Sequence, residues 1–452
     1  MSRTNVGGVR LRRLDLAAAA ADHVLAAERD RLCRRGAVPD PEVRAGARAI
    51  LAELRADPEI GLREASARHG GGLADGRLVL EPTELRAARD DLGAPIRAAL
   101  EQAIENVRRF AESQLPATTV TTIGPGIEIE RRWLPIERVG VYVPGGTAAY
   151  PSSLIMGVVP ARVAGVDHIA VASPAGPDGS VNPILLGAAG LLDVDAFLVA
   201  GGAQAVGALA FGVAAAGLAP VDRVVGPGNA WVTAAKMELA GEVGIDLLAG
   251  PSEGMVLADA AADPVQVAAD LLTQAEHGPD SPAILVTPDR SFADAVEAEV
   301  ARQLATAARR PTLEAALSNH GRIVLAPDLD AAIGFVNAYA PEHLSVDVQP
   351  LEATVARIRN AGSIFVGPWA PESAGDYATG ANHVLPTGGL ARSCGPLAVE
   401  AFGKHSQVQR ISREGLATIR TTVASLAETE GFEAHRAAIE VRFRGGSAWS
   451  AR

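Results

Sequence analysis

The sequence predicts an α/β fold with two blocks of parallel strands that face a common cleft. Strand-like runs bounded by Gly and Pro alternate with helical runs through residues 138–253, and the alternation resumes after residues 254–258. Alternation of this kind is typical of βαβ units around a parallel sheet. The composition agrees, because 48% of the residues are hydrophobic and only 4% are aromatic, which indicates a core of Ala, Val, Leu and Ile.

The expected elements follow the chain in order. Residues 1–115 are charged and Ala-rich with a helical period, and the clearest pair of helices lies in 84–115. In the first block we expect strands in 138–146, 168–174, 196–202, 223–229 and 245–253, and helices in 151–164, 183–192, 203–211 and 231–240. In the second block we expect strands in 283–288, 322–327 and 363–367, and helices from residue 264 and in 292–308, 329–339 and 351–359. After about residue 396 the pattern returns to helix.

Composition argues against several classes of protein. The chain has 41 Lys and Arg against 53 Asp and Glu, a net charge of -12, which disfavours nucleic acid or an anionic membrane as a partner. No apolar run reaches the ~18 residues of a membrane helix, and Ala17–Ala21 is too short for a secretory signal, so we expect a cytoplasmic protein. Cys33 and Cys394 form no CxxC motif, so neither a disulfide framework nor a thiolate zinc site is expected.

An acidic and a basic side chain stand side by side in the run NAYAPEHL at residues 337–344. Glu342 and His343 directly follow Pro341, where a regular helix does not readily continue. An adjacent carboxylate and imidazole at a loop edge is an arrangement that proton-transfer chemistry uses. The structural alternative is that Glu342 is a cap and His343 a hydrogen-bonded core histidine.

A Gly/Pro-rich stretch follows at residues 360–389, and it holds Asp376 and His383. The stretch is too apolar to be a solvated linker, and long irregular segments usually carry function. Its polar residues favour the catalytic interpretation of Glu342 and His343.

Three Gly-rich turns come after predicted strands: VPGG at residue 143, AGGAQA at 200 and GPGNAW at 226. Each leads into a helix, and backbone N–H groups at a helix N-terminus receive anions such as phosphate. Gln204 and Asn229 are the side chains at these turns that can hydrogen-bond a nucleotide. None of the turns is a GxGxxG, and the alternative that the glycines only tighten the turns stays open.

A metal site is indicated by DPVQVAADLLTQAEHGPD. Asp263 is a plausible N-cap, and Gly278 ends the helix after His277. Gln274 and His277 are then i,i+3 on the last turn, where the negative end of the helix dipole favours a cation. Asp376 and His435 are candidates for the further ligands that a catalytic zinc ion needs.

Seven blocks, in this order and at these spacings, resemble the histidinol dehydrogenase family from about residue 40 to the end of the chain. They are ERVGVYVPGGTAAYPSS, GGAQAVGALAFG, VVGPGNAWVTAAK, IDLLAGPSE, DLLTQAEHGPDS, NAYAPEHL and AGSIFVGPWAPESAGDYATGANHVLPTGG. The resemblance implies an enzyme that oxidises L-histidinol to L-histidine through a bound aldehyde, in two NAD-dependent hydride transfers. This is the last step of histidine biosynthesis.

The resemblance also implies roles for individual residues. His343 would be the general base for the alcohol, and Glu342 would activate water for attack on the aldehyde. The implied zinc ligands, which hold the substrate imidazole and amine, are Gln274, His277, Asp376 and His435. The further implied substrate contacts are Ser252, His383 and Glu430, and the implied NAD contacts are Tyr142, Gln204 and Asn229.

The family resemblance further implies a homodimer of incomplete Rossmann-like domains, in which the tail provides Glu430 and His435 to the partner's site. We therefore expect four regions: a helical extension, a zinc-binding catalytic domain, an NAD-binding domain and a helical tail. Their expected ranges are 1–26, 27–138 plus 252–395, 139–251 and 396–452.

Some residues depart from the family pattern. The histidine often found after Phe110 is absent, Gly254-Met255 replaces an aliphatic pair, and the segment near Ala391 is atypical. The family also has paralogues that oxidise other small alcohols, such as sulfonated diols, but retention of Ser252, His383 and Glu430 favours histidinol. A zinc hydrolase is a further alternative, although it leaves the Gly-rich turns without a ligand.

Overall fold

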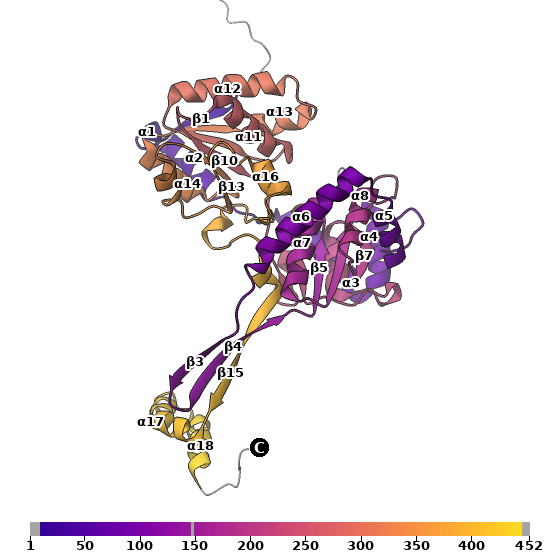
Figure 1. Ribbon diagram of the computed structural model, residues 1–452, viewed down its shortest axis with the longest axis vertical. Helices are drawn as coiled ribbons and strands as arrows, with labels where there is room; N and C mark the ends of the chain where they lie inside the picture. Colours follow the sequence, from indigo (N-terminus) through magenta and orange to yellow (C-terminus); the bar gives the residue numbers. More distant parts are fainter. Residues whose placement is uncertain (1–9, 146–148, 445–452) are drawn as a thin grey trace, which may run out of the picture. The chain divides into compact units, whose positions relative to one another are not determined.

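Two six-stranded sheets form the larger of two units in the computed structural model, which describes residues 10–145 and 149–444 (Figure 1). Unit 1 comprises Met1–Leu115 and Ile136–Phe402, and unit 2 comprises Pro116–Pro135 and Gly403–Arg452. Among the described residues, no helix combines the length and the apolar character that crossing a membrane requires.

Sheet A of unit 1 is entirely parallel. Its strand order is β1 (Arg12–Asp15), β12 (Arg322–Leu325), β11 (Ala283–Thr287), β10 (Gly254–Ala258), β13 (His343–Asp347) and β14 (Ser363–Val366). Successive side chains of a strand point to opposite faces, so β10 sends Val256 to one hydrophobic cluster and Leu257 to another. The first cluster includes α11 (Pro264–Glu276), α12 (Arg290–Leu304) and α13 (Arg310–His320). The second includes α1 (Leu16–Ala19), α2 (His23–Cys33), α14 (Leu329–Tyr339) and α15 (Leu351–Val355).

Sheet B of unit 1 is parallel except at one edge. Its order is β2 (Val79–Leu80), β7 (Ala196–Val199), β6 (His168–Ser173), β5 (Arg138–Tyr142), β8 (Arg223–Val225) and β9 (Gly244–Ile245), with β2 antiparallel to β7. One face packs against α3 (Pro41–Ala56), α4 (Pro58–His69), α9 (Gly202–Phe211) and α10 (Ala230–Leu239). The helices α5 (Pro82–Asp90), α6 (Ala94–Glu112), α7 (Pro151–Ala164) and α8 (Pro183–Leu191) form a second layer, in which α7 packs on β5 and β6.

Both sheets are wound in the same way. The five strands β12-β11-β10-β13-β14 and the five strands β7-β6-β5-β8-β9 each run in the order third, second, first, fourth, fifth. This is the order of a doubly wound α/β sheet, with the reversal of direction beside the first strand. The prediction of two parallel-sheet blocks is confirmed.

The N-terminal third of the chain packs on different sheets from those that we expected. Residues 1–26 were expected to be helical, and residues 1–9 of this range lie outside the described residues. Within the rest, β1 pairs with β12 and extends sheet A. Residues 27–138 were expected to join residues 252–395, whereas α3 to α6 pack on helices of sheet B and β2 pairs with β7. The packing explains this, because Gly207 of α9 allows Leu51 and Leu54 of α3 to approach closely. In the expected strand 245–253, only Ile245 belongs to a strand.

Unit 2 is built on an antiparallel sheet in the order β15 (Gly403–Ile411), β4 (Ile127–Pro135) and β3 (Thr119–Gly124). The helices α17 (Arg413–Thr429) and α18 (Glu433–Glu440) follow β15. The tail from residue 396 was expected to be helical, and β15 corrects this, since all nine of its residues pair with β4. Short 3-10 helices complete the described chain at Ala214–Ala216, Leu390–Arg392, Val399–Phe402 and Val441–Phe443.

A buried ion pair holds the turn after β8. Lys236 of α10 and Asp246 have side chains that are 2% and 1% exposed. The Lys236 Nζ donates to Asp246 Oδ1 and to the carbonyl of Gly226, each at 2.5 Å, and Asp246 Oδ2 accepts from the Gly226 N–H at 2.7 Å. Gly226 has φ +109, and an added Cβ would lie 2.1 Å from the carbonyl oxygen of Tyr142. The pair therefore fixes a turn that requires glycine.

Removing one member of this pair should destabilise the fold strongly. Lys236→Met leaves the Asp246 carboxylate buried without its cation, and we expect the free energy of unfolding to fall by roughly 3–5 kcal/mol. The matched control is Arg97→Met, which breaks the pair with Glu101 whose side chains are 41% and 52% exposed and should change stability by less than about 1 kcal/mol. Urea unfolding of the variants and the wild type measures the difference, and equal losses in both variants would contradict this account.

Candidate active site

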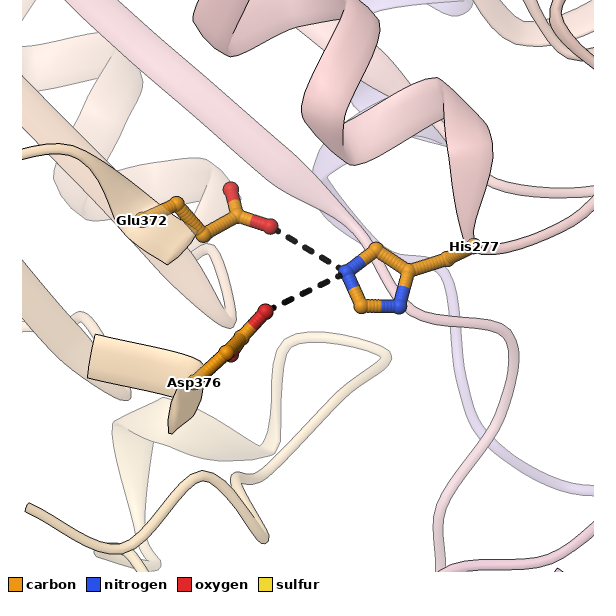
Figure 2. A group of neighbouring side chains, drawn as sticks. All are labelled: His277, Glu372 and Asp376. Carbon is orange, nitrogen blue, oxygen red and sulfur yellow. Dashed lines mark hydrogen bonds and ion pairs between the residues drawn. The ribbon is translucent and has the colours of Figure 1, made fainter. Parts of the chain in front are cut away.

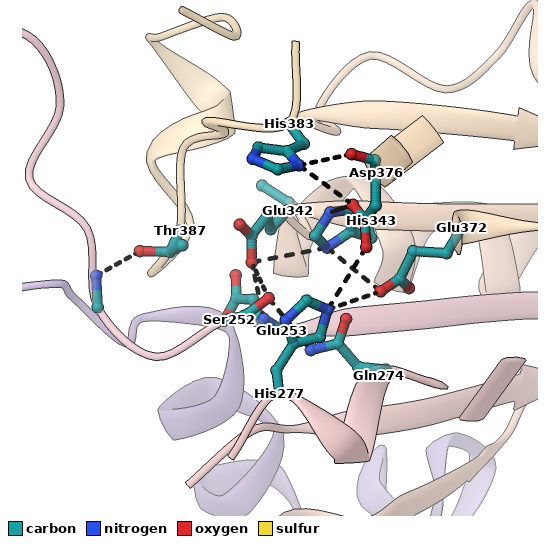
Figure 3. Close-up of polar contacts among 12 residues, drawn as sticks. Ser252, Glu253, Gln274, His277, Glu342, His343, Glu372, Asp376, His383 and Thr387 are labelled. Carbon is teal, nitrogen blue, oxygen red and sulfur yellow. Dashed lines mark hydrogen bonds and ion pairs between the residues drawn. The ribbon is translucent and has the colours of Figure 1, made fainter. Parts of the chain in front are cut away.

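The polar residues predicted from the sequence gather at the amino end of two neighbouring strands of sheet A. Gly254, the first residue of β10, pairs with His343, the first residue of β13. Glu342 immediately precedes β13, and Ser252 lies two residues before the start of β10. The last turn of α11 lies at the same place, since Gln274 Nε2 donates to Ser252 Oγ at 3.3 Å. Figure 3 shows these side chains turned toward one another.

Glu342 is a buried carboxylate with defined hydrogen-bond donors. It is 6% exposed, and its Oε2 accepts from Ser252 Oγ and from the backbone N–H of Glu253, both at 2.8 Å. Burial raises the pKa of Glu342 to about 8, and the nearby charge of Glu253 acts in the same direction. Glu342 is therefore a stronger base than an ordinary carboxylate.

His343 is buried without a hydrogen bond to its ring. It is 3% exposed, and neither Nδ1 nor Nε2 has a partner among the described residues. Carboxylate oxygens of Glu342, Glu372 and Asp376 lie at 3.7, 4.0 and 3.9 Å from its ring nitrogens. Burial lowers the pKa of His343 to about 4, so the imidazole is neutral at physiological pH. In the described part of the chain, His343 therefore lacks the partners that a hydrogen-bonded core histidine would have.

A histidine and two carboxylates form a cluster suited to a metal ion (Figure 2). His277 caps the end of α11, and Glu372 and Asp376 belong to α16 (Glu372–Tyr377). His277 Nε2 lies 3.2 Å from Glu372 Oε1 and 3.8 Å from Asp376 Oδ2. Burial opposes protonation of His277, but the hydrogen bond to Glu372 and the two negative charges outweigh it and raise its pKa.

Gln274 adds an amide oxygen to this region. The residue is 1% exposed, and its Oε1 is buried without a partner among the described residues. Gly254 leaves room for it, because a Cβ there would lie 2.6 Å from this oxygen. An unpaired amide oxygen beside a nitrogen and carboxylate oxygens completes a donor set of the kind that a catalytic zinc ion takes. The residues present therefore fit a metal ion.

His383 connects the cluster to α7 of sheet B. Its Nδ1 lies 3.0 Å from the backbone carbonyl of Asp376, and its Nε2 lies 3.4 Å from Ser153 Oγ. Burial lowers the pKa of His383. The segment after His383 makes a second contact with the loop between β9 and β10, a hydrogen bond of 2.6 Å from the Gly250 N–H to Thr387 Oγ1 (Figure 3).

Unit 1 thus brings together most of the residues predicted for the metal and the substrate. They are Ser252, Gln274, His277, Glu342, His343, Asp376 and His383. Glu430, at the end of α17, and His435, in α18, belong to unit 2, so their participation stays a prediction.

Glu372 was missed from the sequence, although it is 4% exposed and bonded to His277. A usable signal was present. Glu372 precedes Asp376 by four residues, a spacing that places both carboxylates on one face of a helix.

The Gly-rich turns lie at the carboxyl end of sheet B, where the first is described as far as residue 145 and Gly146 lies outside the described residues. Tyr142 ends β5, and its hydroxyl accepts from the Gly202 N–H at 3.3 Å. Gln204 is buried in the first turn of α9, and Asn229 caps α10 by accepting from the N–H groups of Trp231 and Val232 at 3.0 and 3.2 Å. The strand order reverses between β5 and β8, and the crevice at such a point is where doubly wound sheets bind nucleotides.

Comparison with known proteins gives a consistent result. The family model for histidinol dehydrogenase matches residues 33–443. A histidinol dehydrogenase of Leifsonia xyli subsp. xyli (strain CTCB07) is 47% identical over 397 residues, 87% of this chain and 91% of the relative. One of Mycobacterium tuberculosis (strain ATCC 25618 / H37Rv) is 48% identical over 365 residues, 79% of this chain and 82% of the relative.

A solved structure is similar over nearly the whole chain. The crystal structure of histidinol dehydrogenase from Elizabethkingia anophelis has a TM-score of 0.88 at 32% identity, and the match covers 96% of this chain and 98% of that one. The chain therefore belongs to the histidinol dehydrogenase family of oxidoreductases.

Proposed function

We propose that the protein oxidises L-histidinol to L-histidine through L-histidinaldehyde, with NAD as the acceptor of both hydrides, as the last step of histidine biosynthesis. The observation that carries this proposal is the buried His343, whose ring nitrogens have no hydrogen-bond partner within residues 10–145 and 149–444 and have carboxylates within 4.0 Å. A general base must be unprotonated at working pH and within reach of the proton it takes. His343 meets the first condition because burial lowers its pKa.

We infer that Gln274, His277, Asp376 and His435 hold one zinc ion. When bound, zinc would act as a Lewis acid and hold the imidazole and amine of the substrate. Glu372 Oε1 lies 3.2 Å from His277 Nε2, the same nitrogen that faces Asp376, so the Glu372 carboxylate would add negative charge beside the ion.

The two oxidations use different residues in this proposal. His343 takes the proton of the alcohol as the first hydride leaves. Glu342, in the ionised form that predominates above about pH 8, then removes a proton from water as the water attacks the aldehyde carbon. The resulting diol loses the second hydride. Ser252 and the Glu253 N–H orient the Glu342 carboxylate for this role. Ser252, His383 and Glu430 contact the substrate.

NAD would bind at the carboxyl end of sheet B, in contact with Tyr142, Gln204 and Asn229. We further propose a cytoplasmic homodimer, in which the tail of one subunit provides Glu430 and His435 to the site of the other. In this proposal, residues at the amino end of sheet A bind zinc and carry out the proton transfers, and residues at the carboxyl end of sheet B bind NAD.

Two alternatives are weaker. A paralogue acting on a sulfonated diol would keep the base and the metal, but the presence of Ser252, His383 and Glu430 at the family's substrate positions favours histidinol. A zinc hydrolase explains the metal cluster and leaves the turns of sheet B without a ligand.

The first test is the NADH yield per molecule of L-histidinol consumed by the purified protein. We expect two NADH, abolished by a chelator and restored by zinc, because each oxidation transfers one hydride. No NADH from histidinol, with the metal bound and the protein folded, would move the proposal to a paralogue with another alcohol substrate.

Glu342→Gln should separate the two half-reactions. The amide cannot act as a base, so oxidation of histidinaldehyde should fall by at least about 100-fold, while alcohol oxidation stays measurable. Both are followed by NADH absorbance, starting from the alcohol or from the aldehyde. Equal losses in the two half-reactions count against separate roles for Glu342 and His343.

His277→Ala should lower zinc content and turnover together, because it removes a ligand. Zinc per subunit is measured by elemental analysis after dialysis, and turnover by NADH formation. The control is His320→Ala at the end of α13, which should keep both near the wild-type values. Full zinc occupancy in His277→Ala would overturn the ligand assignment.

A further inference from the structure

Arg35 has a guanidinium whose N–H groups are all used. It lies between α2 and α3, and its side chain is 18% exposed. Its Nε donates to Glu253 Oε2 at 2.6 Å, and its Nη2 donates to Glu253 Oε1 and, at 3.4 Å, to the carbonyl of Ala340. Its Nη1 donates to the carbonyls of Tyr339 at 2.6 Å and Leu32 at 3.1 Å. Arginine has five N–H donors, so these five bonds use them all.

Glu253, the carboxylate paired with Arg35, contacts both members of the acid–base pair through its backbone. Its N–H donates to Glu342 Oε2 at 2.8 Å, and its carbonyl accepts from the His343 N–H at 3.2 Å. The residue is 3% exposed. A buried carboxylate without its cation would be strongly disfavoured, so Arg35 allows Glu253 to occupy this position.

The turn held by Arg35 leads directly into the pair. Ala340 has φ 55, the left-handed conformation that residues other than glycine rarely adopt. Such residues persist where their surroundings hold them. Arg35 binds the carbonyls on both sides of the bend, and its guanidinium carbon lies 3.3 Å from the centre of the Tyr339 ring.

We propose that Arg35 is a positioning residue for Glu342 and His343, which it holds from two sides, through Glu253 and through the turn at Tyr339 and Ala340. The kinetic part of this inference rests on the proposed function. A displacement of about 1 Å at reacting groups can reduce turnover about 100-fold. Lysine does not replace arginine here, because a single ammonium cannot bind the carboxylate and both carbonyls in this geometry.

The kinetic test compares Arg35→Met with wild type in the full chain loaded with zinc. We expect kcat to fall about 100-fold in both half-reactions, while KM for histidinol stays within about threefold and zinc per subunit is unchanged, because Arg35 touches neither the substrate positions nor the metal cluster. The kcat of Arg35→Lys should lie between those of Arg35→Met and the wild type.

The matched control is Arg322→Met. Arg322 of β12 is a buried arginine that, like Arg35, donates to backbone carbonyls, those of Asn319 at 3.2 Å and Gly321 at 2.8 Å. The Arg322→Met variant should keep a kcat near that of the wild type. The proposal is overturned if Arg35→Met has a kcat within threefold of this control, or if Arg35→Lys is fully active, since charge alone would then suffice.

Backbone amide exchange tests the positioning without any turnover. Peptides that cover residues 250–256 and 340–346 should exchange at least about tenfold faster in Arg35→Met than in wild type or Arg322→Met, while β11 should be unaffected. Unchanged exchange would overturn the proposal. Amide exchange also distinguishes failure of the proposed function from failure of the Arg35 proposal. A wild-type protein that is inactive on histidinol contradicts the proposed function, and the exchange result still decides the role of Arg35.

Discussion

Burial of ionisable side chains at the amino end of sheet A is the constraint on which the rest of the site depends. Glu253, Glu342, His343 and Glu372 are all less than 7% exposed. An isolated charge at such depth costs several kcal/mol, and the group either finds a partner or becomes neutral. Glu253 pairs with Arg35, and Glu372 pairs with His277. His343 stays neutral, and Glu342 accepts hydrogen bonds from a serine hydroxyl and a backbone N–H. The two residues without a cationic partner among those that the structure describes, Glu342 and His343, are therefore the ones available to accept a proton.

Two sheets with the same winding carry their candidate ligand sites at opposite ends. In sheet B the Gly-rich turns lie at the carboxyl end, the usual place for a nucleotide in a doubly wound sheet. In sheet A the polar residues lie at the amino end, where α11 finishes. A helix C-terminus carries partial negative charge, and with Glu372 and Asp376 it forms surroundings that favour a cation. The local chemistry of each end therefore suits a different ligand, phosphate in one sheet and a metal in the other.

Short-range patterns predicted the parts of the fold that depend on short-range physics. The alternation of apolar strands and helices placed β5 to β8 and α7 to α10, because Gly and Pro mark their ends. The pattern could not show which sheet α3 covers, since Leu51 and Leu54 would suit either one. Nor could it show β15, because KHSQVQRI has few apolar residues and pairs with β4 from a point far away in the sequence. For the site, Gln274, His277, Glu342 and His343 could be proposed from spacing and neighbours. The spacing of Glu372 and Asp376 indicates a shared helix face, but the contact of Glu372 with His277 depends on how α16 packs near α11.

The position of the acid–base pair at the start of a strand has a physical reason. Successive side chains inside a strand point to opposite faces, so two adjacent residues of β13 could not both face the site. His343 is the first residue of the strand, and Glu342 lies just outside it, after the left-handed Ala340. The bend frees Glu342 from the alternation and turns its carboxylate toward Ser252 and the Glu253 N–H. Two adjacent residues can thus face the same site because the backbone before the strand is held in a conformation that alanine does not prefer.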